Sequence, residues 1–214
     1  MILTPIILII LAVLAIPVLL IFGFFSLIQT GFENLGFPPG LVLVILFSML
    51  VGSFINIPLG RRKLIEVTQA RFFGLFRKQR LLAQGLSINI GGAVIPLFIT
   101  GFLLFHVPLR ETLIATLLMT VIVWKLSRVV SGKGIVVPFL IPPVFAALFG
   151  FLLAPQEAAL VAFIAGTLGV LIGADLLHLR KAMRGDISIM SIGGAGVFDG
   201  IFLVGIVAAL LAGL

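Results

Sequence analysis

The sequence predicts an all-α polytopic membrane protein, a single transmembrane domain over residues 1–214 with about seven helices. Of the 214 residues, 62% are hydrophobic and 10% are charged, which lies outside the range of water-soluble domains. The cationic residues also gather in alternate connections between apolar segments. Segments near the ~20 residues that span a bilayer lie at residues 2–29, 38–60, 86–105, 108–128, 135–154, 157–179 and 190–213.

Lysine and arginine are distributed unevenly over the connections. Of the 14, seven lie in the second connection, three in the fourth and three in the sixth, and only Arg110 lies elsewhere. By the positive-inside rule these connections face the cytoplasm, so the N-terminus is inside and the C-terminus outside the cell membrane. The net charge of +7 then reflects topology and contact with the lipid bilayer, and no nucleic-acid partner is expected.

The residue types present exclude several kinds of site. The chain has no cysteine, and therefore no disulfide and no thiolate nucleophile or metal ligand. The histidines, His106 and His178, fall on opposite sides of the membrane in this topology, which argues against a shared metal site. We expect neither a metal nor a cofactor.

The first two spans lead into a strongly basic connection. Pro17 is expected to kink the first helix, and Pro38 and Pro39 to begin the second. Residues 61–82 read RRKLIEVTQARFFGLFRKQRLL, mixing cations with isoleucine, leucine and phenylalanine. This mixture predicts a cytoplasmic amphipathic helix in the headgroup region, with a solvated loop as the alternative.

Polar residues and prolines mark the cytoplasmic ends of several spans. Asn56 and Asn89 either form hydrogen bonds between helices or line a polar path beside the aspartates described below. Pro138, Pro142 and Pro143 disfavour a regular helix at the start of the fifth span. Irregular backbone within a membrane is tolerated where it lines a cavity, so Pro142 and Pro143 are also possible lining residues.

The tetrapeptide Ile-Gly-Gly-Ala occurs at residues 90–93 and again at 192–195, each time after a cytoplasmic connection. The repetition suggests a distant parallel duplication. Alternatively, the small residues simply allow helix backbones to approach closely.

Residues 173–205 carry the candidate chemistry. Asp175 lies five residues before Arg180, and Asp199 seven residues after Ile192. At 1.5 Å of rise per residue, both lie roughly 8–10 Å into the bilayer from the cytoplasmic face. Antiparallel helices joined by a short loop are neighbours, so the carboxyl groups can face each other. An aspartate within a membrane is costly and indicates function.

A close pair of carboxyl groups shares one proton, because both cannot easily ionise. The ionised partner can activate water while the protonated partner polarises a peptide carbonyl. The pair Asp175 and Asp199 therefore predicts an aspartic endopeptidase that cleaves membrane-embedded segments of a peptide or protein.

The residues around Asp199 resemble the presenilin and signal-peptide-peptidase type of intramembrane aspartyl protease, the GxGD superfamily. Residues 196–202 read Gly-Val-Phe-Asp-Gly-Ile-Phe, and Ala174 precedes Asp175 where that family has tyrosine. The resemblance implies a divergent prokaryotic member, with catalytic aspartates in the sixth and seventh helices. Motif and packing residues would then be Gly173, Gly193, Gly194, Gly196, Phe198 and Gly200.

Two other functions use the same residues differently. In a small ion-coupled transporter or channel, Asp175 and Asp199 would bind H⁺ or Na⁺ between broken helices. In a structural membrane protein without activity, the aspartates would only bind Arg180 or asparagine side chains.

Overall fold

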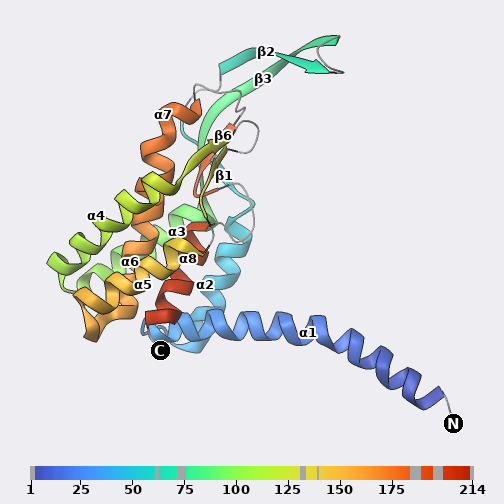
Figure 1. The fold of residues 1–214 in the computed structure, drawn as a ribbon, viewed down its shortest axis with the longest axis vertical. Helices are drawn as coiled ribbons and strands as arrows, with labels where there is room; N and C mark the ends of the chain where they lie inside the picture. The colour runs from blue at the N-terminus through green and yellow to red at the C-terminus, as the bar shows by residue number, and fades with distance from the viewer. Residues whose placement is uncertain are drawn as a thin grey trace.

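The computed structural model describes residues 3–60, 63–71, 76–130, 134–138, 140–183, 189–194 and 200–212. Most of them are helical, as predicted, and each of the seven predicted spans contains a helix (Figure 1). The α-helices are α1 (Leu3–Asn34), α2 (Pro39–Gly52), α3 (Ile95–Leu103), α4 (Leu109–Leu126), α5 (Ile141–Leu153), α6 (Ala158–Val170), α7 (Leu177–Met183) and α8 (Gly200–Ala212). Short helices are η1 (Ile90–Val94), η2 (Leu104–His106), η3 (Pro155–Glu157) and η4 (Leu171–Leu176), of which η1 and η4 are π-helical.

Two helical segments, Leu14–Asn34 and Pro155–Met183, are long and apolar enough to cross a membrane. Shorter apolar helices lie at Pro39–Gly52, Ile90–His106 and Ile141–Leu153. That all seven spans cross a bilayer, and in which orientation, stays a prediction.

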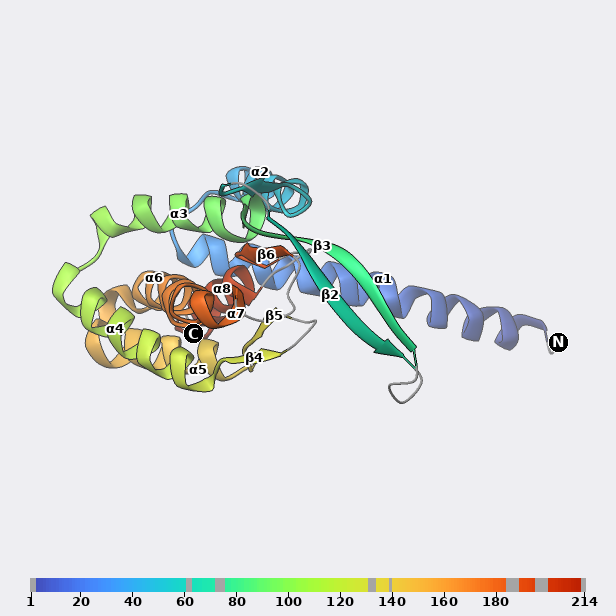
Figure 2. The ribbon, with the colours of Figure 1, turned by 90° about the horizontal axis from the view of Figure 1, so that it is seen from above.

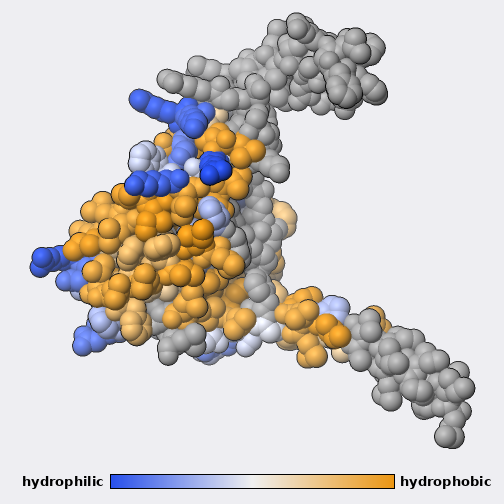
Figure 3. Space-filling model, viewed as in Figure 1, coloured by the Kyte–Doolittle hydropathy of each residue, from blue (hydrophilic) through white to orange (hydrophobic). Residues whose placement is uncertain are grey.

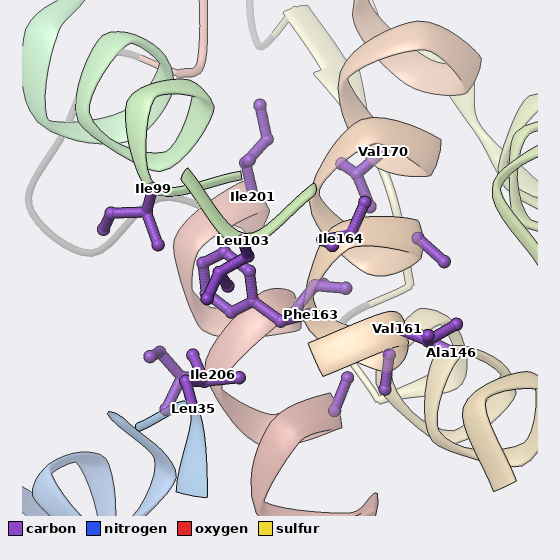
Figure 4. Packing of buried hydrophobic residues seen from close by; sticks show 14 of the residues in the cluster. Leu35, Ile99, Leu103, Ala146, Val161, Phe163, Ile164, Val170, Ile201 and Ile206 are labelled. Carbon is purple, nitrogen blue, oxygen red and sulfur yellow. The ribbon is translucent and has the colours of Figure 1, made fainter. Parts of the chain in front are cut away.

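Helix α6 forms the centre of the bundle and packs against α3, α4, α5 and α8. Almost all of its residues are buried, and many are alanine or glycine. Such small residues let neighbouring backbones approach: a Cβ on Gly166 would lie 3.2 Å from Val204 Cγ1 of α8. Figure 4 shows the large side chain of this helix, Phe163, lying among Leu103, Ile201 and Ile206.

The all-α prediction is incomplete, because strands occupy one end of the bundle. The strands are β1 (Asn56–Pro58), β2 (Lys63–Arg71), β3 (Phe76–Asn89), β4 (Arg128–Val130), β5 (Gly134–Val136) and β6 (Ile189–Ile192). β3 pairs with β2 through its first part, and then with β1 and β6 on opposite sides. The spans predicted at 38–60, 86–105 and 190–213 are therefore helical only in part.

The predicted amphipathic helix at residues 61–82 is wrong. The segment forms an antiparallel hairpin instead, with Lys63 opposite Gln84 and Arg71 opposite Phe76, and Figures 1 and 2 show it projecting beyond the helices. The sequence of β2 includes Ile65, Val67 and Thr68, whose β-branched side chains favour strands. Pairing along β3 satisfies the backbone groups that a helix would have satisfied locally.

The prolines of the fifth span act as predicted on the helix start. β5 and an irregular segment precede α5, and Pro142 and Pro143 lie in its first turn. Proline is tolerated there, because the first N–H groups of a helix have no partner within the helix. Both prolines are buried against the bundle.

Candidate functional site

Asp175 lies at the end of the bundle that carries the strands. It belongs to η4, the π-helical turn between α6 and α7, and its side chain is half-buried. One carboxylate oxygen, Oδ2, accepts a hydrogen bond of 2.8 Å from the backbone N–H of Gly193. Asp175 of the predicted sixth span thus contacts Gly193, near the start of the predicted seventh.

Gly173, two residues before Asp175, allows α4 to approach. A Cβ on Gly173 would lie 2.6 Å from the carbonyl oxygen of Thr120 and 3.1 Å from the backbone nitrogen of Trp124. Only glycine fits such a contact without displacing the neighbouring backbone. Gly173 therefore lets η4 pack closely on α4, and its predicted role in an active-site motif stays a prediction.

His178 is held by backbone carbonyls near the same turn. Its Nδ1 lies 3.1 Å from the oxygen of Gly173 and 3.2 Å from that of Ala174. Because carbonyl oxygens only accept, Nδ1 carries the proton. The imidazole therefore caps carbonyl groups of the helix, which agrees with a structural role.

Gly193 and Gly194 bend the chain after β6. Their φ angles are +80° and +73°, in the left-handed region that side chains with a Cβ disfavour. A Cβ on Gly193 would also lie 2.5 Å from Ala93 Cβ and 2.7 Å from Ala93 N. The Gly-Gly turn therefore requires glycine for both its conformation and its packing.

The two Ile-Gly-Gly-Ala segments consequently meet. Parallel pairing of β3 and β6 brings them together, with Ile88 opposite Ile192, and Gly193 packs on Gly92 and Ala93. This is the close approach that small residues permit. A common origin of the two segments stays a prediction.

A chain of hydrogen bonds runs beside this contact. Asn89 is completely buried; its Oδ1 accepts from Gly92 N at 2.7 Å, and its Nδ2 donates to Ser53 O at 2.7 Å and to Asn56 Oδ1 at 3.1 Å. Asn56 Oδ1 accepts a second bond, of 2.6 Å, from Ser191 Oγ. The asparagines thus connect the end of α2, the start of η1 and strand β6, where the sequence suggested bonds between helices.

The role of Ser191 was not predicted from the sequence. It lies two residues before Gly193, on the strand that positions the glycine N–H. The sequence predicts a helix over this segment, and in a helix Ser191 and Gly193 would not direct their peptide groups to one edge. Strand pairing with β3 could not be recognised locally.

The second predicted acid, Asp199, lies outside the described residues, as do Gly196 and Phe198. Gly200, the next residue, begins α8. α8 packs on α6, with Gly166 against Val204 and Gly205 against Thr167. Figure 1 shows the two helices running in opposite directions: α6 leads toward α7, whereas α8 ends at the C-terminal mark at the other end of the bundle. The first turn of α8 is therefore at the same end of the bundle as Asp175.

Groups of three or more acidic or histidine side chains that could hold a metal ion do not occur among the described residues. A donor to the Asp175 carboxylate in the described structure is the backbone N–H of Gly193. Such a hydrogen bond can orient a carboxylate and hold it in place.

Comparison with known proteins corrects the family suggested by the sequence. Residues 50–211 match a family described as a protein of unknown function (DUF1614). No curated protein and no solved structure matches the chain. Nothing links it to presenilin-like proteases, so that resemblance was wrong. It depended on glycine, phenylalanine and aspartate in a short stretch, residue types that recur by chance in apolar sequence.

Proposed function

The chain belongs to the DUF1614 family, whose function is not known, and from its geometry we propose that it is a multi-pass membrane protein that hydrolyses peptide bonds. Asp175 and Asp199 would be the two acids. The observation that carries the proposal is the hydrogen bond between Asp175 and Gly193 N–H, at the end of an edge strand.

The surface of the bundle supports a membrane location. Large apolar side chains are exposed along α4 and α5, for example Leu117 (65%) in the middle of α4 and Phe151 (59%) near the end of α5. In Figure 3 hydrophobic residues cover the helical body, and hydrophilic ones gather above and below it. An apolar surface of this extent is a liability in water and is the normal surface of a protein in lipid.

Charge at the two ends of the bundle supports the proposed orientation. Lys125 and Arg180 lie at the end that holds Asp175, and Arg110 with Glu111 at the opposite end of α4. Applied to this arrangement, the positive-inside rule faces the candidate site toward the cytoplasm.

Strand β6 suggests an extended peptide as the substrate. Leu59 N–H donates to Leu86 O, so Leu86 directs its peptide groups toward β1. Because the direction alternates along a strand, the even-numbered residues in this part of β3 face β1 and the odd-numbered residues face β6. In the parallel register, the peptide groups of Ser191 and Gly193 then face away from β3, and Gly193 N–H does bond to Asp175. Within the described part of the chain, no strand pairs with this outer edge. An added strand there would lie next to the carboxylate.

The chemistry requires a second acid. In hydrolysis one carboxylate takes a proton from water, the water oxygen attacks the peptide carbonyl carbon, and the protonated acid donates its proton to the carbonyl oxygen, which gives a tetrahedral intermediate. The C–N bond then breaks as the first acid passes its proton to the leaving amine and the second acid takes back the proton of the hydroxyl group, so both acids return to their starting states. We propose Asp199 as that acid, because it directly precedes α8, whose first turn is at the Asp175 end of the bundle.

A structural role for Asp175 is the second candidate, since the same hydrogen bond joins η4 to the turn after β6. Substitution by asparagine separates the two roles. Asparagine keeps an oxygen that accepts from Gly193 N–H, but it cannot exchange a proton as an acid does. Alanine removes both properties.

The experiment is cleavage of fluorogenic transmembrane peptides by the purified protein in liposomes, comparing wild type with Asp175→Asn and Asp199→Asn. Asp186→Asn is the matched control, because it removes an acid from the basic connection. We expect both site variants to lose at least about a hundredfold in kcat and to keep the wild-type unfolding temperature. The control should cleave like wild type.

Three outcomes would reject the proposal in different ways. Cleavage that survives Asp175→Asn assigns the chemistry elsewhere. No cleavage by wild type, together with H⁺ or Na⁺ flux that the two substitutions abolish, assigns a transporter. If neither activity occurs and only Asp175→Ala lowers stability, the aspartate is structural.

A further inference from the structure

We propose that Asn56 is a positioning residue that holds strand β6 so that Gly193 N–H meets Asp175. The mechanistic consequence depends on the function proposed above, but the contacts do not. Asn56 lies 119 residues before Asp175 in the chain, and two hydrogen bonds to its Oδ1 connect it to β6 and to Asn89.

The direction of every hydrogen bond that Asn89 and Asn56 make through their side chains can be assigned. Gly92 N–H is a donor, so the atom of Asn89 that it meets is the carbonyl Oδ1. The NH₂ group of Asn89 then points to Ser53 O and to Asn56. Asn56 must therefore present its oxygen there, and the second lone pair of that oxygen accepts from Ser191 Oγ–H.

The side chain of Asn89 is fixed in one orientation, and it fixes the hydrogen bonds that follow. Its side chain is 0% exposed, and three hydrogen bonds engage its oxygen and its NH₂ group. Rotation of a buried amide with these partners would cost free energy, because a polar group would be left without a partner. Asn89 therefore fixes the position of Asn56 Oδ1, and Asn56 Oδ1 in turn fixes Ser191.

The position of Ser191 decides the contact at Asp175. Gly193 follows Ser191 by two residues, so both direct their peptide groups to the same edge of β6. A shift of the strand at Ser191 therefore moves the N–H that binds the carboxylate. Asn56 acts on the acid through β6 without touching it.

Two substitutions of Asn56 separate positioning from packing. Asn56→Ala removes the oxygen that accepts from Asn89 and Ser191. Asn56→Asp keeps an acceptor in the same place, and it is tolerable because residue 56 is exposed. Positioning therefore predicts a defect in the alanine variant that the aspartate variant restores.

The readout is hydrogen exchange of single glycine amides in the full chain in detergent micelles. Carbonyl ¹³C-isoleucine with ¹⁵N-glycine selects the Ile-Gly pairs, which occur at 90–91, 172–173 and 192–193. The conservative substitution Ile192→Val deletes the Gly193 signal and so identifies it; Ile172→Val does the same for Gly173. Gly173 is the internal reference, because it lies in η4 and packs on α4.

We expect Asn56→Ala to accelerate exchange at Gly193 about two- to tenfold, the effect of losing one net hydrogen bond, with Gly173 unchanged. Asn56→Asp should restore the wild-type rate. Equal acceleration at both glycines, or none at Gly193, would overturn the proposal. A selective effect in a protein that cleaves no peptide would retain the positioning role and reject only the proposed function. Where cleavage occurs, Asn56→Ala should lower kcat with KM unchanged.

Discussion

Replacing Gly193 with alanine should destabilise the protein far more than replacing another glycine of similar backbone conformation. At φ +80°, alanine costs about 1–2 kcal/mol. Its Cβ would lie 2.5 Å from Ala93 Cβ and 2.7 Å from Ala93 N, and forcing that contact apart costs about 1–3 kcal/mol. Displacement of the N–H from Asp175 adds about 1.5–3 kcal/mol, because the acceptor is charged.

The expected loss in the free energy of unfolding is therefore about 3–5 kcal/mol, since the last two effects share one displacement. Gly36→Ala is the matched control: its φ is +87°, and nothing lies within 4 Å of the added Cβ. It should lose only about 1–2 kcal/mol. At roughly 2–4 °C per kcal/mol for a chain of this size, thermal unfolding in detergent, followed by the fluorescence of Trp124, distinguishes the two variants. Equal losses would refute the packing of the two Gly-Gly segments.

Three further predictions test packing and environment. Gly91→Ala should lower the free energy of unfolding by about 3 kcal/mol or more, because the added Cβ would overlap the carbonyl oxygen of Met49. Gly101→Ala is the control: nothing lies within 4 Å of its added Cβ, so it should raise the free energy of unfolding by about 0.5–1 kcal/mol, and thermal unfolding compares the two. Leu117→Lys, on the exposed middle of α4, should make membrane insertion less favourable by about 3–4 kcal/mol, while Leu117→Ala inserts normally. Alkaline extraction of membranes measures this, and equal extraction of the two variants would count against α4 as a span. Thr167→Val should leave the unfolding temperature unchanged or raise it, because the buried hydroxyl of Thr167 has no hydrogen-bond partner in the described structure. A fall of several degrees would mean that the hydroxyl does form a hydrogen bond.

The positions of the helices could be predicted from the sequence. Apolar runs of adequate length recur between basic connections, and each contains a helix. Pro142 and Pro143 also marked the start of α5 correctly. Such signals are local, because hydrophobic length, charge and proline act over a few turns of chain.

The strands could not be predicted in this way. Residues 61–82 have the mixture of cations and apolar residues of an interfacial helix, yet they pair as β2 and β3. β6 pairs with β3 across about a hundred residues of chain, with Ser87 opposite Ser191. A strand exists only with its partner, so its signal is divided between distant segments.

The candidate site shows the same division. Composition alone singled out Asp175 as an acid in an apolar segment, and Asn56 and Asn89 as polar residues near its depth. Only the tertiary structure joined Asp175 to Gly193 and Asn56 to Ser191. By itself, the sequence determined which segments are apolar, where cations gather and which acids are costly to bury, since these properties belong to individual residues and short runs. Tertiary structure decided which backbone N–H meets the acid, because that depends on pairing and on the close packing of glycines from two distant segments.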